Sequence, residues 1–272
     1  MKRIIFVLVG ILFGVYCTGL HSQRPAQSAI SAPVVVVPPV KVSFHIYLLM
    51  GQSNMVGRDT RSLASQVDDP RVLALNSDNH WVVAREPIHT DARIPPGQGP
   101  GIPFALETLK ATSKVTIGLV PCAVGGTPLR RWVKGADLYE ACVARARLAA
   151  QAGSIDGVLW HQGEADTTSQ ENADVYEARL VQMFKDLRKD LGRTDLPIVV
   201  GQLGPFLDPA KYPYLDTVRA AIRNIPTDLP HVGYADSTGL EDRGDKLHFS
   251  ADSQKVFGAR YAKAMREAAS EK

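Results

Sequence analysis

Ser53 follows an apolar run at positions 44–50 and stands in the segment Gly-Gln-Ser-Asn-Met at positions 51–55. A serine directly after a buried strand can project its hydroxyl while the next backbone N–H groups point toward the same space. That is the geometry a nucleophile and its oxyanion hole need. The segment is not the Gly-x-Ser-x-Gly elbow, because Met55 occupies the place of the second glycine. A serine that merely caps the following turn is the alternative.

A glycine pair, Gly125-Gly126, follows a second apolar run at 115–121. Paired glycines let a backbone approach a ligand closely and can direct an N–H at a developing negative charge. An ordinary Gly-Gly turn is equally compatible with this pattern. The pair therefore becomes a candidate oxyanion hole only if the fold brings it next to the serine.

A third apolar run, at 157–161, ends in His161-Gln162-Gly163-Glu164. Polar groups at the end of a buried strand cost free energy unless they are hydrogen-bonded. The Gln162 amide can donate to an oxyanion, or it can belong to a buried network that supports the fold. His161 and Glu164 lack a third ligand at a recognisable spacing and do not form His-Glu-x-x-His. We therefore expect no metal site.

The spacing Asp-x-x-His occurs twice, at Asp228/His231 and at Asp245/His248. The first pair precedes the apolar run 232–235, whereas the second follows it. Because sites in parallel sheets form beyond the carboxyl ends of the strands, the second pair lies on the correct edge. Its spacing lets the carboxylate accept the imidazole Nδ1–H and leaves Nε2 to face the serine. The sequence thus predicts a Ser-His-Asp triad, with a surface histidine at a helix start as the alternative.

Predicted strands and helices alternate along the chain, and they position these side chains. The predicted strands are 44–50, 115–121, 157–161, 197–203 and, more weakly, 232–236; the predicted helices are 104–111, 138–151, 173–191, 215–223 and 250–268. The last helix carries the stripe Phe257, Tyr261 and Met265, with Ser250 as its N-cap. This alternation indicates an α/β fold with a parallel sheet covered on both faces.

The composition excludes several classes of function. The 272 residues suffice for one large domain with a single core. Charged residues make up 22% of the chain and the formal net charge is +3, without a Lys/Arg cluster beyond short pairs. The protein therefore has no strong positive potential that would attract nucleic acid or acidic lipid, and we expect no nucleic-acid partner.

The N-terminus has the features of a secretory signal. Lys2-Arg3 precede an apolar or glycine run at 4–16, which is shorter than the ~20 residues that a membrane-spanning helix needs. A cleaved signal peptide at 1–22 is therefore favoured over an uncleaved anchor. Residues 23–42 contain four prolines and predict an extended linker before a folded domain at 43–272. We expect a secreted or periplasmic protein with no membrane association after signal cleavage.

The sequence holds three cysteines, and Cys17 leaves with the predicted signal. Cys122 and Cys142 can pair in an oxidising compartment, although a buried free thiol is the commoner state for cysteines in apolar and helical patterns. Their spacing does not decide between the two states.

The motifs described above occur in the order found in SGNH-type esterases. More specifically, the chain resembles carbohydrate esterase family 6, the acetylxylan esterases and their sialate O-acetylesterase-like relatives. The resemblance covers roughly residues 44–268. Each motif is weak singly, but four in register are specific. The resemblance implies a flavodoxin-like three-layer α/β/α sandwich, the SGNH hydrolase fold, with no cofactor.

The resemblance also implies roles for individual residues. Ser53 matches the family nucleophile, His248 the base and Asp245 the carboxylate that orients it. The implied oxyanion donors are the backbone N–H groups of Ser53 and Gly126 or Gly125, and the side chain of Gln162, which stands where the broader superfamily uses Asn. The residues expected to contact substrate or support the site are Gln52, Asn54, His161, Glu164, Arg131 and Trp132.

The implied reaction removes O-acetyl groups from a carbohydrate through an acetyl-enzyme, with acetylated xylan or its oligosaccharides as the expected substrate. Trp132 would stack on the sugar and Arg131 would hydrogen-bond to it; a solvated helix start is the alternative for this segment. A sialate O-acetylesterase is the alternative with the same chemistry, in which Arg130 or Arg131 would pair with the sugar carboxylate. A non-catalytic carbohydrate-binding domain is the alternative from another class, and the complete set of Ser, His and Asp argues against it.

Overall fold

The computed structural model describes residues 35–63, 66, 68–90, 94–112 and 114–271. The predicted signal peptide and the first part of the predicted linker lie outside the described residues. At the described end of the linker, the Val36 N–H donates to the Trp81 carbonyl at 2.8 Å, and Val35 forms an isolated antiparallel bridge with Val82. This segment therefore lies along an edge of the sheet before the first strand begins.

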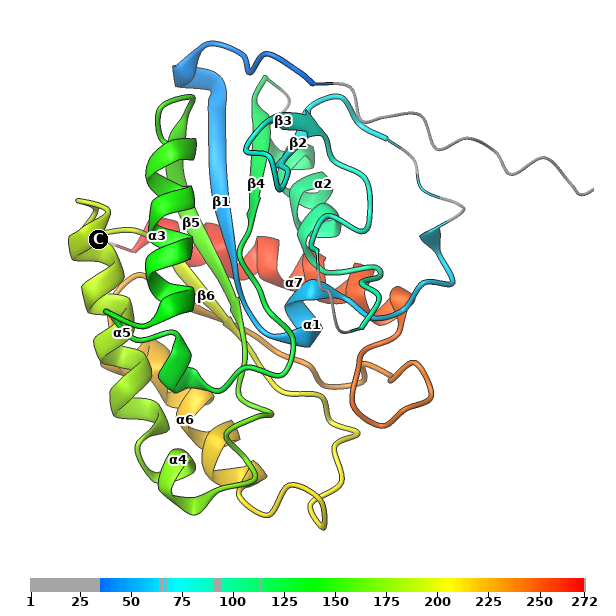
Figure 1. Cartoon of the computed structure of the whole chain (residues 1–272), viewed down its shortest axis with the longest axis vertical. Helices are drawn as coiled ribbons and strands as arrows, with labels where there is room; N and C mark the ends of the chain where they lie inside the picture. Colours follow the sequence, from blue (N-terminus) through cyan, green and yellow to red (C-terminus); the bar gives the residue numbers. More distant parts are fainter. Residues whose placement is uncertain (1–34, 64–65, 67, 91–93, 113, 272) are drawn as a thin grey trace, which may run out of the picture. The chain divides into compact units, whose positions relative to one another are not determined.

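In the described part of the chain, seven strands form one sheet in the order β3-β2-β4-β1-β5-β6-β7 (Figure 1). Their bounds are β1 Phe44–Gly51, β2 Val72–Leu75, β3 Trp81–Val83, β4 Thr116–Pro121, β5 Ser154–His161, β6 Ile198–Gly201 and β7 Val232–Ala235. The predicted parallel sheet is confirmed except at one edge, where β3 runs antiparallel to β2. The sequence pattern does not predict β2, of four residues, or β3, of three.

Helices cover both faces of this sheet (Figure 1). Their bounds are α1 Ser53–Val56, α2 Gly101–Ala111, α3 Asp137–Ala149, α4 Gln170–Asp174, α5 Tyr176–Asp190, α6 Leu215–Asp228 and α7 Ala251–Ser270, with short 3₁₀ turns η1 at Lys41–Ser43 and η3 at Leu129–Arg131. Helices α3, α5 and α6 bury side chains in the core on one face, and α2 and α7 in the core on the other. The architecture is the expected three-layer α/β/α sandwich.

Two details refine the predicted helices. The helix expected at 173–191 is two helices, α4 and α5, because the backbone leaves the helical conformation at Val175 (φ −103°, ψ 0°). The predicted N-cap of the last helix is confirmed, since Ser250 Oγ accepts the Ser253 N–H at 3.2 Å. No helix among the described residues is long and apolar enough to cross a membrane.

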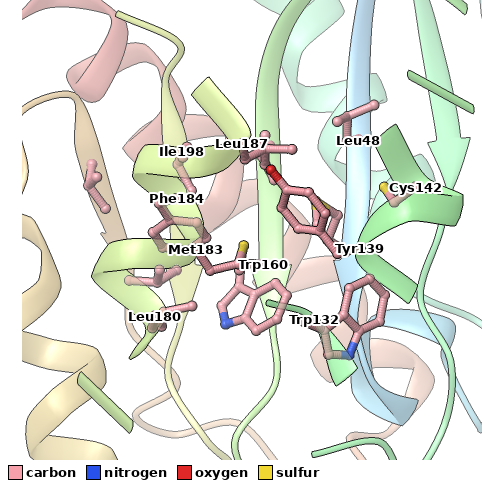
Figure 2. Close-up of a cluster of buried hydrophobic side chains, with 14 of the residues drawn as sticks. Leu48, Trp132, Tyr139, Cys142, Trp160, Leu180, Met183, Phe184, Leu187 and Ile198 are labelled. Atoms are coloured by element: carbon pink, nitrogen blue, oxygen red, sulfur yellow. The ribbon is translucent and has the colours of Figure 1, made fainter. Parts of the chain in front are cut away.

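Two tryptophans organise the core on the α3/α5 face (Figure 2). Trp132 and Trp160 are both fully buried, and their rings meet edge to face with centroids 5.6 Å apart. Phe184 packs on Trp160 in the same way at 5.9 Å. Each such ring removes roughly 150–250 Å² of largely apolar surface from water. The cluster therefore fixes the loop after β4 against the end of β5, close to the carboxyl edge of the sheet.

Candidate active site

Ser53 is the first residue of α1 and lies two positions after the end of β1. The chain turns through Gly51, whose φ of +128° disfavours any residue with a side chain. A Cβ on Gly51 would lie 2.0 Å from the His161 carbonyl oxygen, so glycine is needed for β1 to approach the end of β5 this closely. The Gln52 N–H donates to that same carbonyl at 2.8 Å. These contacts fix the backbone that presents the serine hydroxyl.

The three predicted triad residues lie within hydrogen-bonding distance of one another. Oγ of Ser53 is 3.1 Å from Nε2 of His248, and Nδ1 of His248 is 2.8 Å from Oδ2 of Asp245. The other oxygen of Asp245 accepts the backbone N–H groups of Leu247 and His248 at 3.0 and 2.8 Å. One carboxylate thus holds both the ring and the backbone of the histidine, which leaves Nε2 to accept the serine proton.

The surroundings of Asp245 keep it charged. Burial alone would raise its pKa, but the backbone and ring of His248, the Arg243 guanidinium and the Leu247 N–H stabilise the anion and together hold the pKa well below its ordinary value. Nε of Arg243 donates to Oδ2 at 2.6 Å, the same oxygen that faces Nδ1. Asp245 therefore stays ionised across the range in which histidines titrate. The sequence gives no signal for Arg243, because an arginine two residues from an aspartate has no distinctive pattern.

The other Asp-x-x-His pair, Asp228/His231, lies on the opposite edge of the sheet. His231 directly precedes β7, whereas Asp245 and His248 follow the carboxyl end of that strand. Nδ1 of His231 is 3.3 Å from the Ala268 carbonyl oxygen, near the end of α7. The edge argument that separates the two histidines in the sequence is confirmed.

The glycine pair lies in the loop after β4, the strand next to β1. The Val124 N–H donates to the Gly51 carbonyl at 3.0 Å, which ties this loop to the turn before Ser53. Gly126 has a φ of +66°, is exposed, and would meet no atom within 4 Å of an added Cβ. The backbone at Gly126 therefore borders open space that a ligand can enter.

Gln162 is fully buried beside the nucleophile turn. Its Nε2 lies 2.6 Å from Asp166 Oδ2, 3.1 Å from the Thr127 carbonyl oxygen and 3.2 Å from Gln52 Oε1. Its Oε1 accepts the Tyr176 hydroxyl at 3.0 Å. The two amide hydrogens already face three acceptors, so none is left for an oxyanion. The structure thus contradicts the expected oxyanion role of this side chain and agrees with the alternative, a buried supporting network.

Comparisons with known proteins agree with this geometry. Residues 43–267 match the family described as carbohydrate esterase, sialic acid-specific acetylesterase. The chain belongs to this esterase family. A probable carbohydrate esterase of Arabidopsis thaliana is 34% identical over 238 residues, which are 80% of this chain and 89% of the relative. The protein described here is thus a carbohydrate acetylesterase.

Solved structures support the fold of the esterase. The solved structure of the same Arabidopsis thaliana protein is 32% identical to this chain and has a TM-score of 0.74, with 82% of this chain and 98% of that chain covered. NanS has the same fold at 17% identity, with a TM-score of 0.67 and coverage of 86% and 98%. These similarities agree with the SGNH-type sandwich that the sequence predicts.

Trp132 of the esterase is not placed to stack on a sugar. Its side chain is 0% exposed, and Nε1 donates to Thr127 Oγ1 at 3.0 Å, so it holds the loop after β4 from inside. The expectation of stacking is wrong, because an aromatic residue beside a glycine turn looks the same in sequence whether it faces the core or the solvent. Arg131 is paired with Asp137, to which its Nε donates at 3.1 Å.

Cys122 and Cys142 form a disulfide, with their Cα atoms 5.5 Å apart. Cys122 directly follows β4 and Cys142 lies in α3. The bridge therefore ties the strand that leads to Gly125-Gly126 to a covering helix. The apolar and helical sequence around the two cysteines favours buried free thiols, but the structure has a disulfide instead.

The other residues expected around the site of the esterase, Gln52, Asn54, His161 and Glu164, are all buried. Asn54 and Glu164 share a hydrogen bond, and so do His161 and Glu164. Their side chains therefore pack inside the protein rather than line a surface open to substrate.

Gln162→Ala is expected to lower the melting temperature by several degrees. The change removes the Gln162 donor from the Thr127 carbonyl and from the buried Asp166 carboxylate, which keeps the Leu129 N–H at 2.9 Å, at a cost of about 1–3 kcal/mol. The kcat of the folded fraction should stay within about tenfold of the parent. Thermal unfolding and steady-state kinetics on one purified variant check this. An unchanged melting temperature with a kcat lowered about 10²–10³-fold would instead restore Gln162 as an oxyanion donor.

Proposed function

We propose that this esterase removes O-acetyl groups from carbohydrates by a serine mechanism in which Ser53, His248 and Asp245 form the triad. The contacts between the three side chains support this mechanism: Asp245 Oδ2 lies 2.8 Å from His248 Nδ1, and His248 Nε2 lies 3.1 Å from Ser53 Oγ. In the proposed reaction Oγ attacks the acetyl carbonyl carbon while Nε2 takes the hydroxyl proton. The imidazolium forms beside an ionised carboxylate, which stabilises it.

The negative charge on the carbonyl oxygen is proposed to face the backbone N–H groups of Ser53 and of Gly126 or Gly125. Ser53 opens α1, and N–H groups in the first turn of a helix have no intrahelical acceptor. The imidazolium then gives its proton to the departing sugar oxygen as the C–O bond breaks. A water molecule that His248 deprotonates attacks the acetyl-serine, releases acetate and restores the hydroxyl.

The proposed substrate is a neutral acetylated sugar, with acetylated xylan or its oligosaccharides as the first candidate. A sialic acid carries a carboxylate that needs a cationic partner. Arg131 is already paired with Asp137, and Arg243 with Asp245, so the remaining candidate partner from the sequence is the exposed Arg130. The sialate O-acetylesterase remains the second candidate, because the family that the chain matches is described as sialic acid-specific.

The test is acetate release by purified enzyme from acetylated xylan, from acetylated xylo-oligosaccharides and from O-acetylated sialic acid, with p-nitrophenyl acetate as a general acetyl ester. Higher kcat/KM on the xylan-derived substrates is the expected result. A preference for the sialic acid that Arg130→Ala abolishes would select the second candidate. Binding of sugar without hydrolysis of any ester would show a non-catalytic domain instead.

We also propose that the esterase is exported, with residues 1–22 as a cleaved signal and 23–42 as a linker before the domain at 43–272. The Cys122–Cys142 disulfide supports this proposal, because disulfides persist mainly in oxidising compartments. N-terminal sequencing of the exported protein should find a start between about residues 17 and 23. Retention of Met1 in a membrane fraction would contradict cleavage.

A further inference from the structure

Asn54 connects the nucleophile segment to the loop that carries the base. It follows Ser53 in α1, and its side chain is almost fully buried. Its Nδ2 donates to the Leu247 carbonyl at 3.1 Å, and its Oδ1 accepts the Phe249 N–H at 3.1 Å. These two residues flank His248, so a single amide holds the backbone of the base from both sides.

A buried carboxylate fixes the orientation of that amide. Nδ2 of Asn54 also donates to Glu164 Oε1 at 2.6 Å, so both of its hydrogens are used. Burial alone would raise the pKa of Glu164, but His161 and the Asn54 donor outweigh it, and the pKa lies below its ordinary value. The ionised group can only accept hydrogen bonds. A flipped Asn54 would place Oδ1 against this anion and Nδ2 against the Phe249 N–H, which excludes the alternative orientation.

The carboxylate is itself anchored in the core. Oε1 of Glu164 lies 3.3 Å from Nε2 of His161, the last residue of β5. Nδ1 of His161 is 3.3 Å from the Tyr261 hydroxyl, and its ring packs edge-on against Phe249 and Phe257 with centroids 5.7 and 5.4 Å away. The orientation of Asn54 is therefore set by the rigid end of a central strand.

We propose that Asn54 is a positioning residue for the base: held in one orientation by Glu164, it sets the backbone at His248 so that Nε2 stays within reach of Ser53 Oγ. Asp245 constrains the same histidine from within its own loop, and Asn54 adds a constraint from the nucleophile side. Backbone hydrogen bonds within the loop join the Arg243 N–H to the His248 carbonyl at 2.8 Å and the Ser250 N–H to the Glu241 carbonyl at 2.9 Å, and the Asn54 contacts join the loop to the segment that carries Ser53. The inference rests on the proposed triad.

The test compares Asn54→Ala with Gln254→Ala as a matched control. Gln254 is also a buried amide, and its Nε2 donates to the backbone carbonyl of Asn54 at 2.8 Å without a contact to Leu247 or Phe249. Asn54→Ala should lower kcat for p-nitrophenyl acetate about 10–100-fold, with KM within about threefold, since small displacements of a catalytic group cost about this much. Gln254→Ala should lower the melting temperature but keep kcat within about threefold.

Each change is also made together with His248→Ala. A residue that acts through the base has nothing to act on once the ring is absent, so Asn54→Ala should cause no further loss in that background. An equal loss in both backgrounds, or a normal kcat with His248 present, would overturn the positioning role. Full activity of His248→Ala alone would instead overturn the proposed triad, so the two failures are distinguishable.

A second variant covers the case in which Asn54→Ala does not fold. Glu164→Gln keeps the size of the side chain but removes the charge that orients the Asn54 amide. We expect it to lower kcat about 3–30-fold, again only when His248 is present. Normal kcat in folded Glu164→Gln and an equal loss without His248 would each contradict the proposal.

Discussion

His248→Ala should lower kcat for an acetyl ester by about 10⁴–10⁶-fold, the scale of loss when a triad member is removed from a serine hydrolase. The reason is that Nε2, 3.1 Å from Ser53 Oγ, is the group placed to take the hydroxyl proton. KM should change little, because the imidazole acts mainly as charge develops in the transition state. Steady-state kinetics on the purified variant give both parameters.

His231→Ala is the matched control for this result. It removes the other histidine of the Asp-x-x-His pattern, which lies before β7 at the opposite edge of the sheet. Its kcat should remain within about twofold of the parent. Exchanged phenotypes of the two variants would contradict the assignment of the base.

Gly51→Ala should destabilise the esterase by at least about 3 kcal/mol and abolish its activity. The added Cβ would lie 2.0 Å from the His161 carbonyl oxygen at a φ of +128°, so β1 or β5 must move. That movement would also break the 2.8 Å bond from the Gln52 N–H to the same carbonyl and displace the nucleophile. Denaturant unfolding gives the free energy of unfolding.

Gly192→Ala separates steric contact from backbone strain. Gly192 also has a positive φ, +65°, but an added Cβ there would meet no atom within 4 Å. It should cost only about 1 kcal/mol and leave kcat unchanged. Equal destabilisation by the two variants would show that the close approach of β1 and β5 is not what requires Gly51.

The sequence was sufficient to predict which residues meet at the proposed triad, because their positions follow rules with a geometric basis. Ser53 stands directly after an apolar strand, and strand polarity selects His248 over His231. The spacing of Asp245 and His248 allows the carboxylate to accept Nδ1–H within one turn, at 2.8 Å in the structure. The placement of Ser53 and the choice of His248 each need only the direction of one strand, which the position of the apolar run in the sequence indicates.

Properties that depend on three-dimensional neighbours could not be predicted in this way. Trp132 and Gln162 are both adjacent to the site in sequence, yet Trp132 faces the core and the Gln162 amide is occupied by Asp166 and its neighbours. The pairing of Cys122 with Cys142 depends on how β4 packs against α3, which spacing does not encode. Burial of a side chain near a glycine turn is decided by the packing of distant elements.

Ser53 is the proposed nucleophile, on which the whole mechanism depends. The most direct measurement is to react the purified esterase with a fluorophosphonate, which modifies activated serines, and to locate the adduct by peptide mass spectrometry. We expect one adduct per chain, on Ser53, formed in parallel with loss of acetate release and absent from His248→Ala, because the reaction needs the base that faces Oγ. Full inactivation with the adduct on another residue, or full activity of a stoichiometrically modified Ser53, would contradict the mechanism.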